Sequence, residues 1–287
     1  MFANNENLIK FLASPVQATY KINDIFNTPR IAVFKESDAS AIVGQMRGVA
    51  SEFEELRTLM NGKSVVAIPQ VFEDIVDALG DALVFCDGIP YRLNIQLDDI
   101  EPLYMALDNF VMGSHRFVDL SAAGVDVAGS FTAAFEQSLN DPFAAKFSLT
   151  GICSSNPIPH DSIREVWMVH VSLVTWYKMR NLIVDTLSMM GAPVDKVINA
   201  ILVSNESKLC ATAQEAELSI NDYVSRGMPE DALAVEPNRD ATAYIVRVIR
   251  DFTYIDSKGV KQDVFKGKFL KSIFFRNPDL SFLNGGE

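Results

Sequence analysis

The sequence is poor in cysteine, in basic residues and in long apolar runs. Its three cysteines, Cys86, Cys153 and Cys210, are far apart and odd in number, so neither a disulfide framework nor a zinc-ligand spacing is visible. Lysine and arginine number 25 against 37 aspartates and glutamates, a formal net charge of -12, which argues against a broad electrostatic hold on nucleic acid or on an anionic membrane. The richest apolar run, Val166 to Tyr177, is too short to span a bilayer, and the N-terminus lacks the features of a secretory signal. We therefore expect a cytoplasmic protein that binds neither membrane nor, stably, nucleic acid.

Apolar side chains are plentiful, at 48% of 287 residues, which is enough for one large domain or two small ones. Residues 1 to about 35 mix polar and apolar side chains and predict an extended lead-in, with a turn at Asn27-Thr28-Pro29. Beyond it, apolar spacing predicts helices over about 38–60, 70–93, 97–110, 125–138, 161–190, 194–205 and 212–226. The period then changes to that of strands over 244–255 and 260–270, on either side of a turn at 256–259. The expected fold is an all-α helical bundle with a small C-terminal β-hairpin-like segment.

Two rows of carboxylates follow the first two predicted helices. Glu52 and Glu55 are three residues apart, and Glu73, Asp77 and Asp81 are four apart, so each set falls on one helix face. Like charges at this spacing repel by roughly 0.2–0.5 kcal/mol per pair, and a divalent cation bound by oxygen ligands would relieve that repulsion. The alternative is a solvated face of an acidic protein. The acids border the apolar stripe instead of lying opposite it, which favours a metal site.

A weak internal repeat divides the chain into two halves. In both halves a long helix, a turn at Asn94 or Gly191 and a shorter helix follow in the same order. Aligning the two turns places Asp77 and Asp81 on Val174 and Lys178, so the second copy lacks the acids. We expect residues 1–150 to carry the acidic metal site and residues 151–287 to form a degenerate second half with a basic C-terminal segment, the two together making one compact unit. Chance similarity between two helical hairpins is the alternative.

Five lysines surround the predicted hairpin turn: Lys258, Lys261, Lys266, Lys268 and Lys271. Lysines often protect an edge strand from unwanted pairing, and that is one interpretation of this cluster. In so acidic a chain a local group of cations is also suited to binding phosphate.

Together these segments resemble the all-α nucleoside triphosphate pyrophosphohydrolases, a superfamily that includes MazG-like proteins and phosphoribosyl-ATP pyrophosphohydrolase. The similarity is to a form, commonly phage-encoded, that has SN-x-SK and GK-x-x-K segments. The matching segments are R-x-x-x-x-E-x-x-E over 47–55, D-x-L-x-D over 77–81, SNESK over 204–208 and GKFLK over 267–271. Two departures are the lack of a strict E-x-x-D on the second helix and the insertion that separates the acids from SN-x-SK. Members of this family build each site from two subunits, so the resemblance implies a fused pseudo-dimer with one composite site.

The resemblance implies Mg²⁺-dependent hydrolysis of (deoxy)nucleoside triphosphates to the monophosphate and pyrophosphate. The expected metal ligands, for Mg²⁺ or alternatively Mn²⁺, are Glu52, Glu55, Glu73, Asp77 and Asp81, with Glu52 or Glu55 as general base. The expected substrate-binding residues are Arg47, Asn205, Lys208, Lys268 and Lys271. Phosphoribosyl-ATP is a second substrate candidate, and a non-catalytic nucleotide-binding or scaffold protein is the alternative function. Pseudo-dimers could pair further into a homodimer, and a phage-encoded form would act in the host cytoplasm.

Other reactive or aromatic residues carry less weight. Ser204 or Ser207 with His170 would make a hydrolase pair, but no nucleophile elbow surrounds either serine. Trp176 and Tyr177 lie at helical spacing with Trp167 and are predicted to belong to the core, with base stacking as the alternative.

Overall fold

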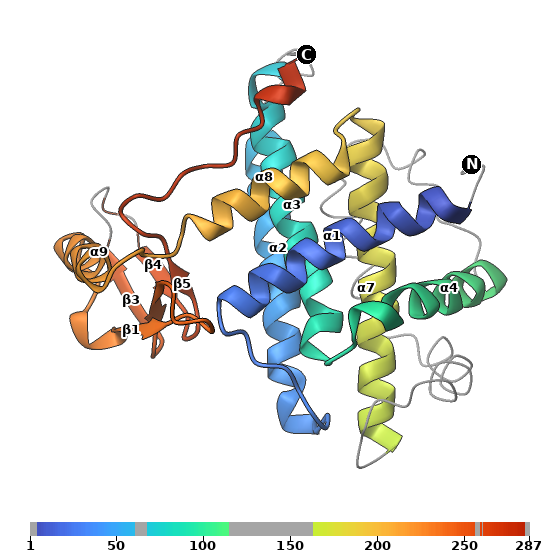
Figure 1. The fold of residues 1–287 in the computed structure, drawn as a ribbon, viewed down its shortest axis with the longest axis horizontal. Coiled ribbons are helices and arrows are strands. Elements are labelled where there is room, and N and C mark those ends of the chain that lie inside the picture. Colours follow the sequence, from blue (N-terminus) through green and yellow to red (C-terminus); the bar gives the residue numbers. More distant parts are fainter. Residues whose placement is uncertain (1–4, 61–67, 115–162, 256–258, 260, 285–287) are drawn as a thin grey trace. The chain divides into compact units, whose positions relative to one another are not determined.

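In the computed structural model, seven α-helices and five short strands make up the described part of the chain, residues 5–60, 68–114, 163–255, 259 and 261–284 (Figure 1). The helices are α1 (Asn5–Ile25), α2 (Ala39–Met60), α3 (Ile68–Arg92), α4 (Leu97–Ser114), α7 (Ile163–Met189), α8 (Val194–Glu206) and α9 (Ala213–Ser225). The strands are β1 (Leu233–Pro237), β2 (Tyr244–Val248), β3 (Phe252–Ile255), β4 (Lys261–Val264) and β5 (Phe269–Leu270). A mostly helical chain with a small C-terminal strand region is what the sequence predicts. The predicted helix over 125–138 lies outside the described residues.

The chain divides into two compact units. Unit 1 consists of Met1–Tyr20, Pro29–Asn199 and Leu280–Glu287, and unit 2 of Lys21–Thr28 and Ala200–Asp279. The boundary expected at 150/151 lies outside the described residues. Charge is unequally shared: unit 1 contains 13 Lys and Arg against 24 Asp and Glu, and unit 2 contains 12 against 13. The acidity of the protein therefore resides almost entirely in unit 1.

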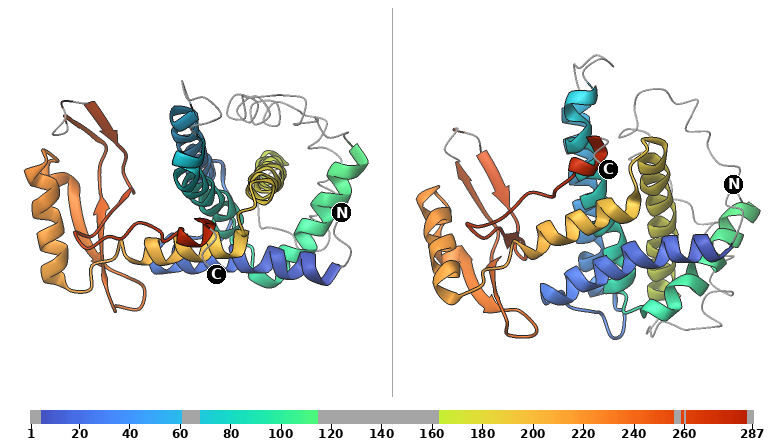
Figure 2. Two further views of the ribbon diagram at one scale, coloured as in Figure 1. Left: turned by 90° about the horizontal axis from the view of Figure 1, so that it is seen from above. Right: turned by 45° about the horizontal axis from the view of Figure 1, so that its top comes forward.

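The centre of unit 1 is α3, which packs against α2 on one side and α7 on another (Figures 1 and 2). Helix α2 buries one apolar stripe at helical spacing: Ile42, Met46, Val49, Phe53 and Leu56. On α3 the fully enclosed side chains include Leu79, Leu83 and Ile89, because this helix has neighbours on two faces. No single helix of the described chain is long and apolar enough to cross a membrane. Helices α7 and α8, which are bent relative to each other, have the required length and apolar composition only when they are counted together.

Four helices end in the same capping motif. The second residue after the end of α1, α3, α7 and α9 has a positive φ and is, in that order, Asn27, Asn94, Gly191 and Gly227. The next N–H then bonds to the carbonyl five residues back, as Ile95 does to Pro90 (3.0 Å) and Ala192 to Leu187 (2.9 Å). The turns predicted at Asn27, Asn94 and Gly191 are thus confirmed. Because α1 and α9 end in the same way, the shared motif does not distinguish a repeat, and the pseudo-dimer stays a prediction.

The expected extended lead-in is wrong, because residues 5–25 form α1. Val16 and Tyr20, four residues apart, are buried, and the Tyr20 hydroxyl donates to the Ile95 carbonyl at 2.9 Å. The helix forms despite Pro15 within it, since burial of an apolar stripe outweighs local propensity. Interspersed polar residues conceal that stripe in the sequence.

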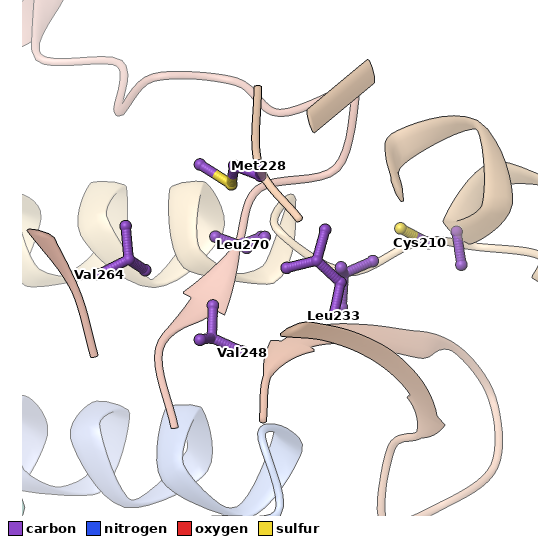
Figure 3. Packing of buried hydrophobic residues seen from close by; sticks show 8 residues of the cluster. Cys210, Met228, Leu233, Val248, Val264 and Leu270 are labelled. Atoms are coloured by element: carbon purple, nitrogen blue, oxygen red, sulfur yellow. The ribbon is translucent and has the colours of Figure 1, made fainter. Parts of the chain in front are cut away.

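Unit 2 contains two small antiparallel sheets, β1-β2-β5 and β3-β4, with α9 against β1 and β2. Its core (Figure 3) includes Cys210, Met228, Leu233, Val248, Val264 and Leu270. The hairpin predicted around 256–259 is confirmed by the pairing of β3 with β4. Each long predicted strand is instead two short ones, because a turn at Phe265–Lys268, with Gly267 at φ 91°, separates β4 from β5. Strand β1, five residues ending in Pro237, was not predicted.

Candidate functional site

Two glycines bring α2 and α3 close together. A Cβ atom on Gly48 would lie 2.5 Å from Cγ of Phe85, and one on Gly88 would lie 2.6 Å from the side-chain amide of Gln45. Gln45 therefore packs over Gly88, and Phe85 packs over Gly48. Residue numbers rise along α2 as they fall along α3, so the helices are antiparallel, and the missing side chains permit their close approach.

The alignment of α2 with α3 places two of the predicted acids in the layer next to the Gly48–Phe85 contact. Glu52 is one turn beyond Gly48 on α2, and Asp81 is one turn before Phe85 on α3. Because the helices are antiparallel, one turn forward on α2 and one turn back on α3 move along the interface in the same direction. Glu52 and Asp81 therefore form the layer next to that of Gly48 and Phe85. Both are half-buried. The helix pairing therefore places Glu52 and Asp81 at about one level along α2 and α3, and their role as metal ligands stays a prediction.

The other three acids extend this layer toward the ends of the helices. Glu55 and Asp77, one turn further along α2 and α3, are exposed and half-buried respectively, and Glu73 is exposed another turn away. Among the described residues no group of three or more Asp, Glu, His or Cys side chains is arranged to hold a metal ion. Mg²⁺ is usually held by only one or two carboxylates together with waters and substrate phosphates. Two carboxylates one turn from the same helix contact, such as Glu52 and Asp81, therefore suit this ion by the chemistry of their donors. Arg47 is exposed on α2.

In unit 2, the SN-x-SK segment at the end of α8 contacts the segment that follows β5. Ser272 N donates to the Lys208 carbonyl at 3.1 Å. Ser204 Oγ donates to the Arg276 carbonyl at 2.9 Å, and the Arg276 N–H donates to Ser207 Oγ at 2.9 Å. The two serines therefore fix a backbone segment more than 60 residues further along the chain, and SN-x-SK lies beside the end of GK-x-x-K.

The predicted substrate-binding side chains of unit 2 make contacts within the protein. Lys208 Nζ donates to Asn205 Oδ1 at 2.6 Å, and Asn205 Nδ2 donates to the Ile201 carbonyl at 2.9 Å. Lys271 Nζ lies 3.8 Å from the centroid of the Phe275 ring, whereas Lys268 is exposed. Because both ends of the Asn205 amide have protein partners, contact with a base or ribose would require those bonds to break.

A buried polar cluster between α3 and α7 was not predicted. Asp87 and Arg180 are 0% and 1% exposed, and Arg180 Nε lies 3.1 Å from Asp87 Oδ1. Trp176, correctly predicted as a core residue, donates its indole N–H to the same oxygen at 2.8 Å. Burial raises the pKa of Asp87, while the Arg180 charge and the two hydrogen bonds lower it. The only signal in the sequence is that Asp87 directly follows the apolar run from Ala82 to Cys86, whereas Arg180 lies next to polar Asn181 and close to Lys178.

No family model, no curated protein and no solved structure matches the chain. The described part of the chain is mostly helical with a small antiparallel strand region, and the carboxylates of α2 and α3 stay a predicted site. The resemblance to pyrophosphohydrolases therefore depends on the segments quoted above.

Proposed function

We propose that this protein is a Mg²⁺-dependent nucleoside triphosphate pyrophosphohydrolase and that its metal and phosphate site lies on α2 and α3. The observation that carries the proposal is the layer of Glu52 and Asp81, one turn beyond the contact of Gly48 with Phe85. Two half-buried carboxylates at one level on facing helices repel each other, and a hard cation relieves that repulsion.

Each acid then has a distinct role. Glu52 and Asp81 would hold Mg²⁺ from the two helices, and Asp77 and Glu73 would extend the ligand set along α3. The cation, when bound, neutralises phosphate charge and acidifies a water ligand. Glu55, which is exposed, would accept the proton of the water that attacks the α-phosphorus. The bond between the α-phosphorus and its bridging oxygen breaks, and pyrophosphate leaves.

Phe85 supports a nucleoside as the group that carries the phosphates. Its ring packs on Gly48 yet stays 36% exposed, in the layer next to Asp81. An exposed aromatic face is suited to stacking on a base of any identity. Arg47, which is exposed on α2, is the proposed phosphate-binding cation of unit 1.

The test is the release of pyrophosphate and monophosphate from a panel of dNTPs and NTPs by the full-length chain, with Mg²⁺, Mn²⁺ or EDTA. Asp81→Asn and Glu52→Gln should each lower kcat by roughly 10²-fold or more, because a metal-binding carboxylate is lost. Asp74→Asn and Glu54→Gln are matched controls, since they remove the same charge at exposed positions of the same two helices. Equal losses in all four variants, or orthophosphate as the product, would contradict the proposal.

A non-catalytic nucleotide-binding protein is the second candidate. The observation in its favour is that, among the described residues, no group of three or more Asp, Glu, His or Cys side chains is arranged to hold a metal ion. Calorimetric binding of a nucleotide without turnover by the folded wild-type chain would establish this alternative.

A further inference from the structure

The buried pair Asp87–Arg180 is incompletely hydrogen-bonded. Asp87 Oδ1 accepts from both Trp176 Nε1 (2.8 Å) and Arg180 Nε (3.1 Å). The second carboxylate oxygen, Oδ2, and the guanidinium nitrogen Nη2 have no hydrogen-bond partner among the described residues, although both atoms are enclosed. Buried polar atoms are nearly always bonded to protein or to ordered water, so these two atoms indicate a bonding partner beyond the described residues.

The fixed shape of the guanidinium places the unused Nη2 beside the bond that Nε makes to Asp87 Oδ1. In a guanidinium, Nε–H and one Nη2–H point from the same edge, and this edge usually meets both oxygens of a carboxylate in parallel. Here Nε reaches Oδ1 alone, so Nη2 and Oδ2 flank the one bond that is made. A single small molecule beside that bond can reach both atoms.

The chemistry of the two atoms selects that molecule. Nη2 can only donate a hydrogen bond, and ionised Oδ2 can only accept one. An anion would accept from Nη2 but could not donate to Oδ2, and a cation would face the positive charge of Arg180. We propose that one buried water molecule accepts from Arg180 Nη2 and donates to Asp87 Oδ2, closing a ring between α3 and α7.

This water site would connect the two helices that form the centre of unit 1. Trp176 and Arg180 lie one turn apart on α7, and both donate to Asp87 on α3. With the water in place, both oxygens of Asp87 and the Nε and Nη2 atoms of Arg180 have partners, and a buried polar network is most stable when its members are bonded. The cluster then fixes the register of α3 against α7, because an apolar contact of the same size would not specify one alignment.

A crystal structure of the full-length chain, at a resolution that resolves ordered water, tests the site directly. The expected result is one density peak within hydrogen-bonding distance of both Asp87 Oδ2 and Arg180 Nη2. A direct bond between these two atoms, with no density beside it, would overturn the proposal, and so would density that only an ion explains.

A solution measurement on the protein with Asp87 and Arg180 intact tests the water site independently. In water-selective nuclear Overhauser spectra, the Trp176 indole proton should show a cross-peak to a long-lived water, with Trp167→Phe used to assign the two indole signals. The variant carrying both Asp87→Leu and Arg180→Met removes both hydrogen-bonding groups and should lose the cross-peak. A cross-peak that is absent from the Trp167→Phe protein, or that persists in the double variant, would contradict the water site.

Discussion

At the scale of single residues, the pairing of Asp87 with Arg180 is the contact most sensitive to truncation. Arg180→Met would leave a carboxylate that is 0% exposed without its cation, which should lower the free energy of unfolding by about 3–5 kcal/mol. The double change Asp87→Leu with Arg180→Met should cost far less than the sum of the single changes, because no charge remains buried. Urea denaturation of the four proteins measures this coupling, and additive losses would show that the pair does not act as a unit.

The loss caused by Arg180→Met should also depend on pH. Burial raises the pKa of Asp87, and Arg180 opposes that rise, so removing Arg180 leaves the folded pKa further above the unfolded value. A raised folded pKa means that the folded state binds the proton more tightly, and stability falls as pH rises through it. The variant should therefore regain part of its stability between pH 7 and pH 4, relative to wild type in the same buffers.

At the scale of elements, the closeness of α2 and α3 can be tested with two glycines of the same helix. Gly44 has nothing within 4 Å of where a Cβ would lie, so Gly44→Ala should raise the free energy of unfolding by about 0.5–1 kcal/mol through helix propensity alone. A Cβ on Gly48 would overlap the Phe85 ring, so Gly48→Ala should be destabilising by roughly 1–3 kcal/mol. Thermal and urea denaturation measure whether each substitution raises or lowers the free energy of unfolding. If both alanines stabilise equally, the helices are not in close contact at Gly48, and the layer of Glu52 and Asp81 loses its support.

Element types were largely predictable, whereas contacts between elements were not. Apolar spacing and stop residues predict α2, α3 and α7 to within three residues of their observed ends, because these signals are local. Helix α1 was not predicted, because polar residues interrupt the apolar spacing along it. The faces that carry Glu52 and Asp81 follow from spacing, but their common level depends on Gly48 and Gly88, whose role is visible only in the packed structure. Asp87 and Arg180, 93 residues apart, were unpredictable for the same reason.

At the scale of the whole molecule, charge is divided between the two units. Unit 1 has 13 Lys and Arg against 24 Asp and Glu, whereas unit 2 is almost balanced. Such an excess of one sign destabilises a compact unit through self-repulsion, and any salt relieves part of it by screening. A divalent cation should therefore act on unit 1 in two ways, by general screening and by binding at Glu52 and Asp81, and stability measurements can separate the two.

Added Mg²⁺ should raise the thermal midpoint of the wild-type protein more than NaCl at the same ionic strength. Screening depends only on ionic strength, whereas a bound ligand adds RT ln(1 + [L]/Kd), about 2.7 kcal/mol at 100 times Kd. Scanning calorimetry without nucleotide measures the excess, which should disappear in Asp81→Asn and remain in the control Asp74→Asn. If Mg²⁺ and NaCl have the same effect on the wild type, the carboxylates of α2 and α3 are an ordinary solvated face and the metal site is excluded for the nucleotide-free protein. An excess that survives in Asp81→Asn would place the cation elsewhere in the protein.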